Sequence, residues 1–174
     1  MVKLALVPAY IFSLLLSPQR MAELRREMVS AISSSKTTDS LYSSLNTQLN
    51  KTPIITCYIA ALQALKAKHS WNPYFKFKYL NDSEKTFDNA VTADPQNMEI
   101  RFMRFSVEHY VPVFLGDDKD LYADREEIID DIKKKRYTTA DKDLVTAIVK
   151  FLLASKRCTP AENTYLTKQL NSLK

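Results

Sequence analysis

The sequence predicts an all-α protein built from stacked antiparallel helix pairs. Glycine occurs once, at Gly116, whereas proline occurs seven times, so the chain is interrupted mainly by a residue that favours helix starts. Apolar side chains recur at steps of three and four residues along most of the chain. Alternation of period two with β-branched residues, which is typical of strands, is missing over any useful length.

The composition predicts one folded domain. The chain has 174 residues, of which 45% are hydrophobic and 26% are charged, as in ordinary globular proteins. The net charge of +5 is spread over 25 basic and 20 acidic residues, so nucleic acid is not predicted as a partner. The basic run 133–136 follows acidic residues on one predicted helix and is interpreted as a solvated, dipole-matched helix end; a nucleic-acid patch is the alternative.

Residues 1–17 predict a signal peptide. Lys3 precedes an uncharged stretch from Leu4 to Leu16, which fits a signal sequence and is too short to cross a bilayer comfortably. We therefore expect a periplasmic or secreted protein whose single helical domain spans 18–174, with no membrane span after signal removal. Two alternatives stay open, namely a buried first helix in a cytosolic adaptor and a retained membrane anchor.

About seven helices are expected after the signal segment. The first two are amphipathic, and their inward faces are predicted from apolar residues at helical spacing: Met21, Leu24, Met28 and Ile32, then Leu41, Tyr42, Leu45 and Leu49. A stronger helix follows Thr52-Pro53, with alanines that permit close helix approach. Another follows Asn72-Pro73, and its spacing predicts that Tyr74, Phe77 and Leu80 point inward.

The second half of the chain continues the helical pattern. The segment 98–110 is apolar nearly all round and is expected to be a central helix. A loop at 111–118 contains Gly116, and helices are predicted at about 119–136, 140–156 and 160–173. The last of these has a capping box with a first-turn proline, formed by Thr159, Pro160 and Glu162.

The segment from Tyr74 to Pro95 resembles part of a tetratricopeptide repeat. Tyr74, Phe87, Ala90 and Pro95 fall at the spacing of that repeat's aromatic, packing and turn positions, and Ser83 stands where the repeat has its central alanine. The resemblance implies stacked helix pairs, whose concave surfaces recognise proteins or peptides.

The middle of the chain is also similar to a group of short exported bacterial helical proteins of unassigned function. The similarity rests on three segments between Ala64 and Phe105: ALKAKHSWNPY, DPQN and EIRFMRF. It implies an envelope or secreted location and no particular activity.

Two groups of residues are candidate binding sites. On the 98–110 helix, Arg101, Arg104 and Glu108 share a polar stripe, with His109 beside it. Paired guanidinium groups suit an anion or a peptide carboxylate; the alternative is an ion-pair network between helices, for example from Glu108 back to Arg104.

The second group is His69, Trp71 and Asn72, at a helix start where backbone N–H groups could meet an anion. Aromatic residues follow, with Lys76 and Lys78 between them. Such interleaving can stack bases, but helical spacing favours aromatic residues in the core beside a solvated lysine face.

No catalytic residue, cofactor or metal site is predicted. The glycine- and histidine-containing motifs of nucleotide-binding proteins, zinc proteases and serine hydrolases are missing. Cys57 and Cys158 have no metal-ligand spacing and are expected to be unpaired structural thiols, with one disulfide as the alternative.

The sequence thus predicts an exported module that binds a partner protein or peptide in a groove between helix pairs. One alternative is an enzyme of unrecognised type with a site near Arg101, Arg104, Glu108 and His109. Another is a cytosolic helical adaptor.

Overall fold

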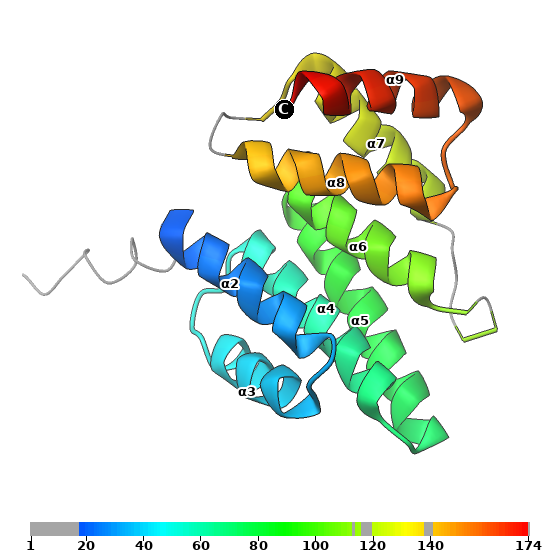
Figure 1. Ribbon diagram of the computed structural model, residues 1–174. Coiled ribbons are helices and arrows are strands. Elements are labelled where there is room, and N and C mark those ends of the chain that lie inside the picture. The colour runs from blue at the N-terminus through cyan, green and yellow to red at the C-terminus, as the bar shows by residue number, and fades with distance from the viewer. Residues whose placement is uncertain (1–17, 113, 116–119, 138–140, 174) are drawn as a thin grey trace, which may run out of the picture.

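The computed structural model describes residues 18–112, 114–115, 120–137 and 141–173, and these form an all-α protein (Figure 1). The signal-peptide prediction for 1–17 and the predicted turn at Gly116 lie outside the described residues. Eight helices are described, in agreement with the predicted fold class. They are α2 (Pro18–Ala31), α3 (Ser35–Asn46), α4 (Pro53–His69), α5 (Pro73–Ala93), α6 (Met98–Tyr110), α7 (Leu121–Lys134), α8 (Lys142–Ser155) and α9 (Pro160–Ser172).

The three helix starts predicted from cap-proline pairs are confirmed. The side chain of Thr52 accepts a hydrogen bond from the Ile55 N–H, and that of Asn72 accepts one from Tyr74. At α9 the capping box is complete, because Thr159 and Glu162 each accept from the backbone N–H of the other. Each cap satisfies a backbone donor that a helix end would otherwise leave unpaired.

Lysine, in place of glycine, ends two of the helices. Lys135 after α7 has φ 52° and Lys156 after α8 has φ 58°, both in the left-handed region. A side chain there costs on the order of 1 kcal/mol relative to glycine. Arg136 then folds back to Glu127, Asp130 and Asp131, so the end of the basic run pairs with acidic residues that precede it.

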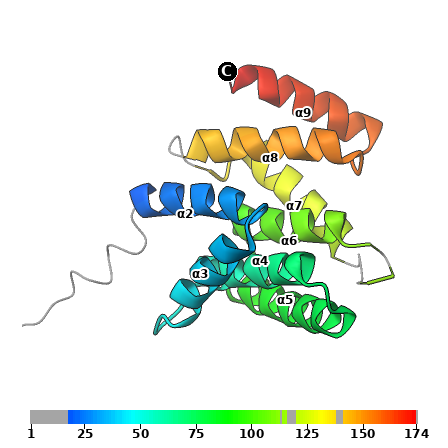
Figure 2. The ribbon, with the colours of Figure 1, turned by 60° about the horizontal axis from the view of Figure 1, so that its bottom comes forward.

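The helices stack in layers, with α6 in the middle (Figures 1 and 2). One core cluster joins α2, α3 and α4, a second joins α4, α5 and α6, and a third joins α6, α7, α8 and α9. Ile100 belongs to the second cluster and Phe105 to the third, and both are completely buried. This confirms the prediction that 98–110 is a central helix.

Helices α4 and α5 form an antiparallel hairpin. Ser83 donates from Oγ to the Ala60 carbonyl at 2.8 Å, and Lys76 donates from Nζ to the Ala67 carbonyl at 3.2 Å, so the register runs in opposite directions. Ser83, Phe87 and Ala90 are buried, as expected for packing positions. A repeated stack of tetratricopeptide type stays a prediction.

The predicted inward orientation of Tyr74 and Phe77 is wrong. Tyr74 is 70% and Phe77 46% exposed. The buried side of α5 passes through Ser83 and Phe87. Two helical turns before Ser83 this side reaches Lys76, whose ammonium group donates to the last turn of α4. Spacing alone placed the inward face about one residue away from its true position.

Two further apolar residues lie outside the core. Ile32 is 48% and Leu49 88% exposed, contrary to the predicted inward faces of the first two helices. Helix α2 ends at Ala31, which is fully buried, and α3 ends at Asn46. Both residues therefore follow a helix end, where the helical period no longer fixes their direction.

Candidate functional site

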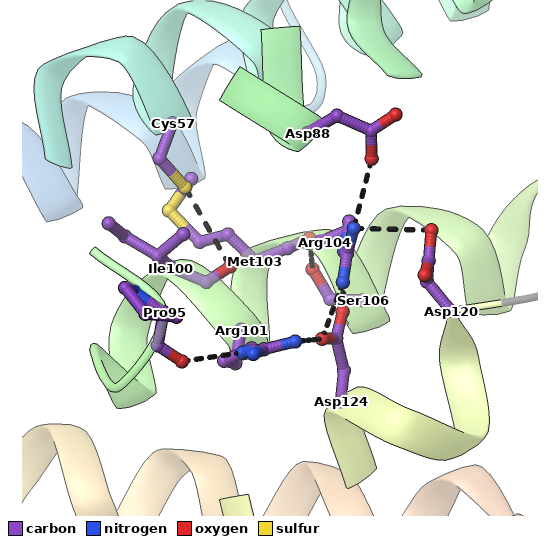
Figure 3. A network of polar contacts seen from close by, with 10 residues as sticks. All are labelled: Cys57, Asp88, Pro95, Ile100, Arg101, Met103, Arg104, Ser106, Asp120 and Asp124. Atoms are coloured by element: carbon purple, nitrogen blue, oxygen red, sulfur yellow. Dashed lines mark hydrogen bonds and ion pairs between the residues drawn. The ribbon is translucent and has the colours of Figure 1, made fainter. Parts of the chain in front are cut away.

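The polar side of α6 is engaged in an ion-pair network with α7 (Figure 3). Arg104 donates from Nε to Asp124 Oδ2 at 2.7 Å and from Nη2 to Asp124 Oδ1 at 2.8 Å. Arg101 donates from Nη1 to Asp124 Oδ1 at 2.8 Å and from Nε to the Pro95 carbonyl at 2.9 Å. Asp124 is completely buried, and the hydrogen bonds from these two guanidinium groups satisfy its oxygens in place of water.

Two more carboxylates approach Arg104 from other segments. Its Nη1 lies 3.0 Å from Asp88 Oδ1 on α5 and 3.1 Å from Asp120 Oδ2 just before α7. Burial works against the charge of Arg104, but the hydrogen bonds to Asp124 and the charges of Asp124 and Asp120 outweigh it and raise the pKa of Arg104 above its ordinary value. The charges of Arg101 and Arg104 are therefore balanced by three carboxylates in an ion-pair network between helices. Anion binding at these two arginines stays a prediction.

Glu108 lies one turn beyond Arg104 on α6. Its Oε2 is buried and has no hydrogen-bond partner among the residues that the structure describes. Burial raises the pKa of Glu108 to about 8; Asp120, Asp124 and Glu84 act in the same direction, and Arg104 opposes them. The carboxyl group is therefore largely protonated at neutral pH, and Arg104 directs its hydrogen bonds to Asp124 and Asp88.

His109 contacts a different part of the fold from the two arginines. Its ring centroid lies 4.9 Å from that of Tyr110, 5.7 Å from that of Phe151 on α8 and 6.4 Å from that of Phe105. Burial and, less strongly, the charge of Arg157 lower the pKa of His109. Arg101 and Arg104 thus make an ionic contact with α7 and His109 makes an aromatic contact with α8, whereas Glu108 takes part in neither.

His69 and Asn72 have structural contacts at the turn between α4 and α5. The Nε2 of His69 lies 3.0 Å from the Ala31 carbonyl at the end of α2, which fixes this nitrogen as the donor. Asn72 caps α5. The third candidate at this turn, Trp71, is 97% exposed.

Exposed aromatic and basic side chains lie close to Trp71 along the chain, and we call them together with Trp71 the aromatic–lysine surface. It consists of Lys68, Trp71, Tyr74, Phe75, Phe77 and Lys78. Phe75 contacts Tyr74 edge to face at 5.4 Å and stacks on Tyr79 at 6.2 Å, so part of this surface is held in place by ring contacts. Tyr74 and Phe77, which the sequence assigned to the core, therefore lie on the outside of the α4–α5 hairpin.

A second buried ionic site on α6 was not predicted. Tyr58 donates its hydroxyl to Glu99 Oε1 at 2.6 Å, and Arg25 donates to Oε1 at 2.8 Å and to Oε2 at 2.6 Å. These residues come from α4, α6 and α2. They lie far apart along the chain, so no local sequence pattern indicates that they pair. The only local indication is that Glu99 lies in the first turn of α6, where the helix dipole stabilises an acidic side chain.

Within the described part of the chain, no cluster of three or more histidine, cysteine or acidic side chains is placed to hold a metal ion. Cys57 and Cys158 are both free thiols, and Cys57 is fully buried. Burial raises the pKa of both thiols, which disfavours the reactive thiolate. Among the described helices, none has the length and apolarity needed to span a membrane.

The fold and these sites define an all-α protein whose central helix is tied to its neighbours by buried ion pairs and whose α4–α5 turn carries exposed aromatic side chains. No protein-family model matches the chain, and no curated protein and no solved structure matches it.

Proposed function

We propose that the protein is an exported helical interaction module that binds a partner protein or peptide through the aromatic–lysine surface. The observation that carries the proposal is the 97% exposure of Trp71 beside the exposed Tyr74, Phe75 and Phe77. Large aromatic side chains supply most of the binding energy at many protein interfaces. A cluster of them in contact with water has no evident role in holding this fold together.

The α6 residues support a structural role more strongly than an enzymatic one. Arg101 and Arg104 are balanced by Asp88, Asp120 and Asp124, and such balanced charge is poorly suited to recruit a substrate anion. The enzyme alternative near Glu108 and His109 therefore ranks second. Export rests on the sequence of residues 1–17 and on the resemblance to exported bacterial proteins; recovery of a cytosolic protein with an intact Met1 would contradict it.

Site-specific photocrosslinking tests the binding proposal. A photoreactive phenylalanine analogue is placed at Trp71 and, as a matched control, at Tyr110, which is 74% exposed outside the aromatic–lysine surface. We expect a discrete protein adduct in cells from position 71 and none from position 110. Equal labelling from both positions, or none from position 71, would contradict the proposed function.

A further inference from the structure

We propose that the segment recognised by the aromatic–lysine surface is an acidic, apolar stretch of a partner protein, in which carboxylates are interleaved with large apolar side chains. This inference rests on the proposed function and names the chemistry of the partner. Two independent observations carry it: the distribution of charge around the α4–α5 turn and the kinds of side chain that are exposed there.

The charge distribution favours an anionic partner. No acidic residue occurs between Asp39 and Asp82, whereas four lysines in that interval flank the turn, namely Lys66, Lys68, Lys76 and Lys78. Lys66 pairs with Asp39 and Lys78 with Asp82. Lys68 and Lys76 instead donate to the backbone carbonyls of Ile32 and Ala67, which satisfies their hydrogen bonds without cancelling their charges. This end of the molecule therefore keeps an excess of positive charge that attracts carboxylates.

The positions of these lysines bring the charge next to the aromatic rings. Lys68 lies in the last turn of α4 and Lys78 in the second turn of α5, on either side of Trp71 along the chain. The turn lies at the end of the α4–α5 hairpin, away from α8 and α9 (Figure 1). A segment laid across Trp71 can thus place apolar groups on the rings and carboxylates on the neighbouring ammonium groups.

The side-chain types favour a protein segment over a phosphate-rich partner. Arginine, whose planar fork matches phosphate oxygens, does not occur between Arg26 and Arg101. The exposed area is instead mainly aromatic: Trp71, Tyr74, Phe75 and Phe77 outnumber the two exposed lysines of the surface. Tryptophan and tyrosine are the side chains that most often anchor protein interfaces, where apolar contact gives affinity and charge gives orientation.

The test uses a fluorescein-labelled peptide in which glutamate alternates with leucine, added to the whole protein and followed by fluorescence anisotropy. We expect saturable binding that weakens at least about tenfold when glutamine replaces glutamate, and by a similar factor in the Trp71→Ala protein. Lys68→Gln, which removes a charge that no described carboxylate pairs with, weakens binding and reduces its salt dependence, whereas Lys150→Gln on α8 and Tyr110→Ala leave binding unchanged. Circular dichroism and the unfolding temperature of each variant establish that the fold is retained.

Three results would overturn the acidic-segment proposal: no binding of the glutamate peptide, equal binding of the glutamine peptide, or equal binding by the Trp71→Ala protein. Vesicles of phosphatidylglycerol and a single-stranded oligonucleotide are tested in parallel. Binding of either one in a Trp71-dependent manner, without binding of the peptide, would identify a bilayer or a nucleic acid as the partner instead. If the photoreactive residue at position 71 gives a discrete protein adduct in cells but the peptide test fails, the proposed function stays intact. Only the proposal that the partner segment is acidic would then be rejected.

Discussion

Arg104 of α6 and Asp124 of α7 are joined by two hydrogen bonds, from Nε to Oδ2 at 2.7 Å and from Nη2 to Oδ1 at 2.8 Å. Asp124 is completely buried and Arg104 is nearly so. In such a pair the attraction offsets the cost of removing both charges from water, and the loss of one partner leaves the other buried and uncompensated. The pair therefore fixes the contact between α6 and α7 and makes it sensitive to single substitutions.

Replacing Arg104 with methionine is expected to lower the free energy of unfolding by about 3–5 kcal/mol, because Asp124 keeps its buried charge and loses its bidentate partner. Arg26→Met, at an exposed position of α2, is the matched control and should change it by less than about 0.5 kcal/mol. Urea denaturation measures both. In the Arg104→Met, Asp124→Leu double variant most of the loss should be recovered; a double variant no more stable than the single one would contradict the explanation by an uncompensated charge.

Arg101→Leu distinguishes a structural from a ligand-binding role for the arginine stripe. Arg101 supplies one bond to Asp124 and one to the Pro95 carbonyl, so we expect a loss of about 1–3 kcal/mol in the free energy of unfolding. The measurement is again urea denaturation. Unchanged stability together with loss of a bound anion or peptide would favour the binding site that the sequence left open.

Glu108→Gln is expected to stabilise the protein at alkaline pH. The pKa of Glu108 is raised from 4.5 to about 8 in the folded state, so the folded protein retains a proton that the unfolded chain releases. The stability that this retained proton contributes is fully present below the unfolded pKa of 4.5. It decreases as the pH rises from 4.5 towards 8 and is lost above about 8. The neutral amide cannot ionise, so the variant should unfold at a higher temperature than the native protein at about pH 9 and gain little at about pH 5. An equal change at both pH values would show that Glu108 is not buried in its neutral form.

Tyr58→Phe removes the hydroxyl that donates to Glu99 Oε1 at 2.6 Å. Because the acceptor is a buried carboxylate, we expect a loss of about 1.5–3 kcal/mol in the free energy of unfolding. Tyr110→Phe, at a position that is 74% exposed, should be neutral. Thermal and urea unfolding provide the measurement, and equal effects of the two substitutions would argue against a strong Tyr58–Glu99 bond.

Trp71→Ala is expected to change the free energy of unfolding by less than about 0.5 kcal/mol, because the side chain is 97% exposed. The same substitution should abolish capture of the partner. A variant that is clearly destabilised would show that Trp71 supports the fold, and the case for the aromatic–lysine surface as a docking site would then fail.

Local signals explain how far the candidate sites could be predicted. The stripe of Arg101, Arg104 and Glu108 follows from helical spacing, and an interhelical network was one of its two interpretations. Its principal partner, Asp124, lies in an acidic stretch where nothing in the spacing singles it out as the buried carboxylate. The Arg25–Glu99 pair joins residues 74 positions apart, a contact that depends on how α2 packs near α6.

The sequence by itself determined the helices, because their starts depend on local chemistry: a cap residue, a proline without an N–H, and an apolar period over a few turns. Only the tertiary structure decided which side of α5 is buried and which charges are compensated. Tyr74 and Phe77 are exposed because the packed side of α5 leads to Lys76, and Arg101 and Arg104 are neutralised because α7 brings Asp124 to them. Burial and ion pairing depend on neighbours that are distant in sequence, and these become defined only when the helices pack.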